Sequence, residues 1–146
     1  LVPCYLAGND GIVNMPYYDL LMANDLSLYP SYYEPWGYTP LESCAFKIPC
    51  ITTDLSGFGQ WVDEVLGHSG TLTDGVSVIH RDDNNYFEAA REICLAMEYM
   101  IGATAKEREA NRKKAAKLAE KAQWQHFIKH YYEAYDFALR KAGGKS

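Results

Sequence analysis

Short apolar runs alternate with amphipathic stretches along the chain, and this alternation predicts strands that alternate with helices. Clusters of Gly, Pro, Asn or Asp bound the apolar runs, as they usually bound strands. We therefore predict four strands, over residues 1–7, 25–29, 50–53 and 71–80, the last with a break at Asp74 and Gly75.

The amphipathic stretches predict six helices, over about residues 14–24, 40–47, 61–66, 85–101, 104–122 and 124–142. Asn14 is expected to cap the first of them, with Pro16 in its first turn. Thr39 is the expected N-cap of the second, followed by Pro40 and a T-x-x-E capping box completed by Glu42. A further capping box, from Thr104 to Glu107, opens the fifth.

This order of elements is typical of an α/β fold, a Rossmann-like parallel sheet flanked by helices and ending in two long helices. We expect a single-domain fragment with an α/β portion over residues 1–80, helices over 81–142 and a flexible tail over 143–146. The two long helices should pack outside the sheet or against a partner domain. The chain opens on an apolar run without a Met, so we expect it to be a piece of a larger protein.

Composition narrows the class of protein. Of 146 residues, 48% are apolar, which excludes a disordered chain. The net charge is −5, and the basic residues gather after residue 100, among glutamates. An acidic body argues against nucleic acid, and no apolar run is long enough to span a membrane. Without C-x-x-C spacing, reduced core thiols and a cytoplasmic location are expected for the four cysteines: Cys4, Cys44, Cys50 and Cys94.

Candidate chemistry lies where two loops leave the carboxyl ends of strands, at residues 30–39 and 54–59. The first loop runs into the start of a helix, where free main-chain N–H groups and the helix dipole favour a phosphate. Gly37, Tyr38 and Thr39 are the expected donors. Glu34 and Glu42 flank this position; the alternative is that Glu42 only caps the helix and Glu34 faces solvent.

Two strings of residues, PSYYEPWGYTPLES and IPCITTDLSGFG, resemble the signature of glycogen synthases of the eukaryotic and Bacteroides-like type. These are retaining glycosyltransferases of the GT-B architecture. The match is dense over residues 17–61 and reappears at Asn111, Arg112 and Trp124. The resemblance implies part of the C-terminal domain of an enzyme that transfers glucose from UDP- or ADP-glucose to the non-reducing end of an α-1,4-glucan.

The resemblance also implies a role for each matching residue. Glu34 would be catalytic, beside the transferred glucose, and Glu42 would bind the ribose hydroxyls. Tyr17 would stack on the nucleobase. The main chain of four residues would hold the sugar and diphosphate: Trp36, Gly37, Tyr38 and Thr39. Three residues of the second loop would line the sugar or acceptor side: Ser56, Gly57 and Phe58.

Enzymes of this kind need no metal or organic cofactor, and they supply an Arg and a Lys to the diphosphate from an earlier loop of the same domain. Residues 1–46 contain neither Lys nor Arg. We therefore expect the fragment to be inactive without its missing segments and the missing N-terminal domain, although the full-length enzyme could form an oligomer. Residues 103–112 hold Glu and Ala where eukaryotic members carry an Arg cluster for glucose 6-phosphate, which argues against that regulation.

Other readings stay open. A retaining GT-B transferase with another donor or acceptor would carry the same loops. A non-catalytic module that binds carbohydrate or nucleotide would use exposed aromatic residues such as Tyr32 and Tyr33. A phosphorylase is disfavoured because Lys47, the single Lys before residue 106, sits at a helix end. A glycosidase pair of glutamates, or zinc on His126 and His130, ranks lower still.

Overall fold

The structure is a computed structural model that describes residues 6–143. These residues contain a three-stranded parallel sheet in the order β1-β2-β3, formed by Ser27–Leu28, Cys50–Thr53 and Val76–Ile79. In the register of the sheet, Ser27 pairs with Cys50 and Cys50 with Val76. The predicted α/β class is confirmed. Most of the strand predicted over residues 1–7 lies outside the described residues, and Ala7 forms an isolated antiparallel bridge with Pro16.

The helices occur in the predicted order, although their ends differ. They are α1 (Tyr17–Met22), α2 (Tyr38–Ala45), α3 (Gly57–Leu66), α4 (Tyr86–Gly102), α5 (Ala105–Lys121) and α6 (Trp124–Gly143), with a short 3₁₀ helix, η1 (Leu72–Asp74), before β3. The capping box of Thr104 and Glu107 is present at the start of α5. The first half of the strand predicted over residues 71–80 is instead η1, which a capping box of Thr71 and Asp74 opens.

The cap predicted at Asn14 is wrong. Pro16 precedes α1, and Asn14 lies in a loop with a positive φ of 54°. The carboxylate of Asp10 accepts hydrogen bonds from the main-chain N–H groups of Ile12, Val13 and Asn14, which folds this segment into a turn. These bonds lower the pKa of Asp10. The side chain of Asn14 closes the turn onto the Gly11 N–H and is therefore not available to α1.

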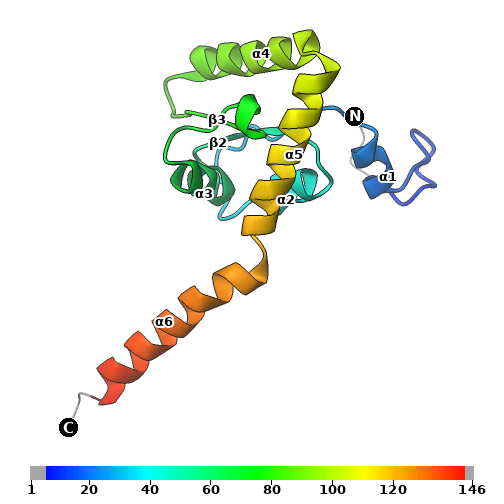
Figure 1. The fold of residues 1–146 in the computed structure, drawn as a ribbon. Coiled ribbons are helices and arrows are strands. Elements are labelled where there is room, and N and C mark those ends of the chain that lie inside the picture. The colour runs from blue at the N-terminus through cyan, green and yellow to red at the C-terminus, as the bar shows by residue number, and fades with distance from the viewer. Residues whose placement is uncertain (1–5, 144–146) are drawn as a thin grey trace.

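The core lies on both faces of the sheet because every residue of β2 and β3 is buried. The helices α2, α3 and α5 contribute to a core cluster with Cys50, Val76 and Val78. On the other face, α4 and η1 cover Ile51 and Ile79. Figure 1 shows these helices around the sheet, with α6 extending away from it.

The thiols of Cys44 and Cys50 are buried, as predicted for core cysteines; they are not joined by a disulfide, and their Sγ atoms form a hydrogen bond of 3.8 Å. The core position expected for Cys94 is wrong, because Cys94 is exposed on α4, and Cys4 lies outside the described residues. The hydrogen bond to Cys44, and then burial, raise the pKa of the Cys50 thiol. Both buried thiols therefore act as small apolar side chains of the core.

The two long C-terminal helices differ in how much of their surface packs against the rest of the protein. The helix α5 packs against α2 and η1, outside the sheet as expected. No residue of α6 is buried, and large apolar side chains such as Tyr132, Phe137 and Leu139 are exposed along it. Residues 144–146 of the predicted flexible tail lie outside the described residues. Within residues 6–143, none of the helices combines the length and the apolar character needed to cross a membrane.

Close packing of α5 depends on Gly75, which has a φ of 97°. A Cβ at this position would overlap the main-chain N and Cα atoms of Ala115. We expect Gly75→Ala to lower the free energy of unfolding by about 2 kcal/mol, measured by urea denaturation, because strain and overpacking add. The matched control is Gly102→Ala, where a Cβ would meet open space and stability should hold or rise. An equal response of the two variants would contradict this account of α5 packing.

Candidate functional site

Two loops meet at the carboxyl edge of the sheet, as the sequence predicts. The first, residues 30–37, is called the donor loop below. A parallel bridge joins its Glu34 to Ser56 of the second loop. The N–H of Glu34 donates to the Leu55 carbonyl over 3.2 Å, and the N–H of Gly57 donates back to the Glu34 carbonyl over 3.0 Å. A Cβ on Gly57 would overlap the Pro35 carbonyl oxygen, so the close approach of the loops requires glycine there.

The helix that follows the donor loop starts earlier than the sequence predicts. The N-cap of α2 is Gly37, with φ 116° and ψ 70°, and Tyr38 is the first helical residue. The capping box predicted from Thr39 to Glu42 is therefore wrong, and α2 has no side-chain cap. The left-handed conformation of Gly37 turns the chain into the helix two residues before Thr39, which leaves Thr39 inside the first turn.

Main-chain donors gather at the start of α2. Among the described residues, the N–H groups of Gly37, Tyr38 and Thr39 donate to no acceptor. We call these three groups the anion site. Pro40 brings no N–H group, and the N–H of Leu41 already closes the first turn onto the Gly37 carbonyl at 3.4 Å. Free donors at the positive end of a helix dipole favour a negatively charged group such as a phosphate.

The carboxylate of Glu34 lies beside the anion site. Its Oε2 would be 3.6 Å from a Cβ built on Gly37, and it accepts a hydrogen bond from Ser31 Oγ over 3.1 Å. The Ser31 carbonyl in turn accepts from Thr53 Oγ1 at the end of β2, over 2.6 Å. Glu34 is only partly exposed, and these contacts fix it to the sheet edge.

Glu42 lies next to Tyr18 and near enough to Tyr17 for its charge to act on that hydroxyl. The Oε1 of Glu42 lies 3.5 Å from the Tyr18 hydroxyl, and Glu42 faces α1 rather than the end of its own helix. Burial, and then the charge of Glu42, raise the pKa of Tyr17. Tyr17, Tyr29 and Thr39 line a cavity of about 420 Å³. Burial raises the pKa of Tyr29 to about 12, so this cavity carries neutral hydroxyl groups.

The side chains of Ser56 and Phe58 point into the protein. Ser56 caps α3, because its Oγ accepts from the Gly59 N–H over 3.0 Å and donates to the Thr53 carbonyl over 3.0 Å. Phe58 is fully buried, and its N–H donates to the Trp36 carbonyl over 2.6 Å. A contact of these residues with a sugar, as predicted from the resemblance, would have to come from their main chain or from Gly57, and it stays a prediction.

An aromatic cluster under the donor loop was not predicted. The Trp36 ring lies 5.5 Å from Phe127 of α6, 5.9 Å from Trp61 and 6.0 Å from Phe58, measured between ring centroids. The helical spacing of Trp124 and Phe127 indicates an apolar face on α6 but does not say what it covers. Glu64 lines the same cavity as His126 and His130. Even so, no three His, Cys, Asp or Glu side chains in the described part of the chain are placed to hold a metal ion.

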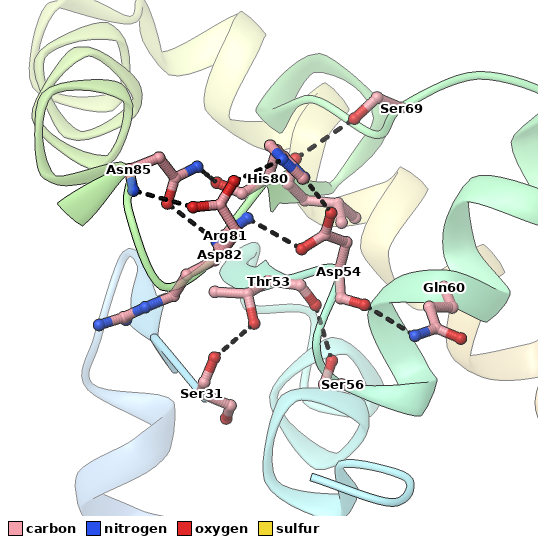
Figure 2. Close-up of polar contacts among 11 residues, drawn as sticks. Ser31, Thr53, Asp54, Ser56, Gln60, Ser69, His80, Arg81, Asp82 and Asn85 are labelled. Atoms are coloured by element: carbon pink, nitrogen blue, oxygen red, sulfur yellow. Dashed lines mark hydrogen bonds and ion pairs between the residues drawn. The ribbon is translucent and has the colours of Figure 1, made fainter. Parts of the chain in front are cut away.

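A second group that sequence analysis missed lies at the same edge of the sheet (Figure 2). Asp54 follows β2 and His80 follows β3; Asp54 Oδ2 is 2.5 Å from His80 Nδ1, and Asp54 Oδ1 accepts from the main-chain N–H of Arg81 over 2.9 Å. The Oδ2 atom of Asp82 is 3.7 Å from His80 Nε2. The sequence feature that could have predicted this group is that polar residues directly follow two adjacent parallel strands. The carboxyl ends of such strands lie at one edge of the sheet.

The ion pair of His80 and Asp54 predicts a pH dependence of stability. The hydrogen bond to Asp54, its charge and the charges of Asp82 and Glu92 raise the pKa of His80 above 6.5. A raised pKa in the folded state stabilises the protein below about pH 6.5, and this contribution is lost as pH rises through the raised value. We expect the difference in melting temperature between wild type and His80→Gln to be present near pH 6 and to shrink toward pH 8.5. A difference that grows with pH would contradict this assignment.

Comparison with known proteins gives the same family throughout. A family model described as glycogen synthase matches residues 1–145. Glycogen [starch] synthase isoform 1 of Saccharomyces cerevisiae is 29% identical over 140 residues, which cover 96% of this chain and 20% of the relative. The Neurospora crassa glycogen [starch] synthase has the same identity and coverage. The liver form of Mus musculus is 28% identical over 142 residues, 97% of this chain and 20% of the relative. The chain therefore spans about a fifth of the length of these curated relatives.

Proposed function

Because the chain belongs to the glycogen synthase family, we propose that it forms the donor-binding part of a glucosyltransferase. The reaction is transfer of glucose, with retention at the anomeric carbon, from UDP- or ADP-glucose to the non-reducing end of an α-1,4-glucan. One observation carries the proposal. Three free main-chain N–H groups at the start of α2 lie beside the carboxylate of Glu34.

In this proposal, the diphosphate of the donor binds the anion site. The N–H groups of Gly37, Tyr38 and Thr39 donate to its oxygens, and the dipole of α2 stabilises negative charge on the leaving group. The site as proposed includes no metal and no organic cofactor. The main chain of Trp36 extends the contact toward the sugar, with Gly57 and its neighbours Ser56 and Phe58 on the sugar or acceptor side.

The proposed role of Glu34 is to stabilise the positive charge that develops on the sugar as its bond to the diphosphate breaks. The hydrogen bond from Ser31, itself tied to Thr53, holds the carboxylate in place before substrate binds. A group that needs no reorganisation during the reaction is more effective. Glu42 binds the ribose hydroxyls, and Tyr17 stacks on the base in the cavity that it shares with Tyr29 and Thr39.

The remaining parts of the active site are proposed to lie outside this chain. No Lys or Arg occurs before Lys47, so side-chain cations for the diphosphate must come from elsewhere. We propose that an N-terminal domain completes the cleft and binds the glucan, that the chain alone does not turn over, and that any oligomer forms in the full-length protein. The free thiols of Cys44 and Cys50 support a cytoplasmic location for it.

The proposal is tested by glucose transfer from labelled UDP-glucose and ADP-glucose to glycogen, using the full-length protein. Incorporation from one of the two donors, with α-linked product, is the expected result. The competing function is a glucan-binding module, which the 82% exposure of Tyr33 and the 71% exposure of Tyr38 favour. Glycogen binding without glucose transfer, and without affinity for either nucleotide sugar, would establish the binding module and overturn the proposal of a glucosyltransferase.

A further inference from the structure

The loop after β3 is held rigid by its own side chains (Figure 2). Asp82 Oδ1 accepts from the N–H groups of Asn84 and Asn85 over 2.6 Å and 2.9 Å, and Asn85 Oδ1 accepts from the Asp82 N–H over 2.9 Å. Asn85 Nδ2 donates to the His80 carbonyl over 3.0 Å. With the Asp54 carboxylate on the other side, the main chain at Arg81 is fixed to both β2 and the start of α4.

The side chain of Arg81 leaves this fixed base and reaches the donor loop. Its Nη1 donates to the Pro30 carbonyl over 2.9 Å, and its Cζ lies 3.8 Å above the centre of the Tyr32 ring. A planar guanidinium can make both contacts at once, because its face stacks on the ring while its edge donates. These contacts bracket Ser31, the residue whose hydroxyl donates to Glu34.

A buried atom shows that the guanidinium is partly withdrawn from water. Within residues 6–143, the Nε of Arg81 is the one buried side-chain N or O atom without a hydrogen-bond partner. A buried donor without a hydrogen-bond partner loses its hydration, which is unfavourable. Other contacts of the side chain must therefore compensate for placing Arg81 Nε here. The contacts with Pro30 and Tyr32 hold the side chain there.

We infer that Arg81 is a positioning residue that sets the place of Glu34, by clamping residues 30–32 of the donor loop against the sheet edge. The clamp and the hydrogen bond from Thr53 to the Ser31 carbonyl hold the same segment from two sides. The hydrogen bond and the ring contact of the Arg81 side chain reach Pro30 and Tyr32 and not the anion site, so its effect is on the placement of the carboxylate and not on the binding of the diphosphate. The kinetic part of this inference rests on the proposed function.

The test uses the full-length protein and two readouts. In glucose transfer, Arg81→Ala should lower kcat about tenfold to a hundredfold and leave the donor KM within about twofold, because a small displacement of a reacting group is enough to lose that much. Arg81→Lys keeps the charge but not the planar group, and should recover part of the rate. Tyr32→Ala should lower kcat similarly, Tyr32→Phe should not, and the double Ala variant should be no slower than Arg81→Ala alone.

The second readout needs no substrate. Amide hydrogen exchange of residues 31–36 should become faster in Arg81→Ala, while exchange in β2 stays unchanged. The matched control is Arg91→Ala, an exposed Arg on α4, which should change neither readout. Unchanged exchange in the donor loop, or faster exchange with a wild-type kcat, would overturn the inference. If wild type transfers no glucose, the proposed function fails, and exchange alone then decides whether Arg81 holds this segment.

Discussion

Replacing Glu34 with Gln is expected to lower kcat for glucose transfer by at least about a hundredfold, the size of effect seen when one preorganised charge-stabilising group is lost. Gln is nearly isosteric and still accepts the hydrogen bond from Ser31, so the donor loop keeps its shape. What is lost is the negative charge beside the anion site. Because the diphosphate binds through main-chain groups in the proposed site, KM for the donor should change by less than about threefold.

Two further variants make this result specific. Glu34→Ala also removes the acceptor of the Ser31 hydrogen bond, so its kcat should be no higher than that of Glu34→Gln. Its melting temperature should stay within a few degrees of wild type. Glu88→Gln changes an exposed carboxylate on α4 and should leave kcat alone. Wild-type rates for Glu34→Gln would end the catalytic assignment of Glu34. A collapse of the melting temperature in Glu34→Ala would show instead that this carboxylate is needed for the fold.

The elements that position the site could be predicted because their signals are local. The buried runs of β2 and β3 are apolar and bounded by turn residues, and Glu34 and Gly37 lie in a motif that is dense in specific residue types. Parallel strands then place both loops at one edge of the sheet. These steps require neighbours in sequence only, and they hold in the structure.

The capping of α2 could not be predicted in this way. The string T-P-L-E satisfies the rule for a capping box from Thr39 to Glu42, but tertiary contacts decide the start of the helix. The Trp36 carbonyl is held by the Phe58 N–H, and Gly37 takes a φ of 116° immediately afterwards. The loop pairing with residues 54–58, rather than local capping, therefore decides where α2 begins. The contact between Asp54 and His80 could not be predicted for the same reason, because these residues are 26 positions apart in the sequence.

The donor loop is thus held by segments far from it in sequence. Arg81 and Thr53 both contact its beginning, and Phe127 of α6 packs on Trp36 near its end. The last contact is notable because the rest of α6 leaves the body of the protein.

Replacing Gly37 with Val is the second change for which we expect a large effect, a fall of about a hundredfold in kcat/KM that comes chiefly from a higher donor KM. The φ of 116° is rarely adopted by an L-residue and least of all by a β-branched one. A Cβ would also lie 3.1 Å from Pro40 Cγ and 3.2 Å from Phe58 Cβ, so the chain must shift where its N–H groups are proposed to face the diphosphate. Donor titration and steady-state kinetics on the full-length protein measure the effect.

The control for this variant separates backbone strain from damage to the anion site. Gly67 ends α3 with a φ of 75°, and a Cβ there would meet nothing within 4 Å. Gly67→Val should therefore lose about 1–2 kcal/mol of stability through strain alone and keep the donor KM of wild type. If Gly37→Val lost stability to the same extent but bound the donor normally, the main-chain groups at the start of α2 would not be the diphosphate site. A higher KM confined to Gly37→Val is the result expected if the anion site binds the diphosphate, because the strain of a positive φ is common to both variants.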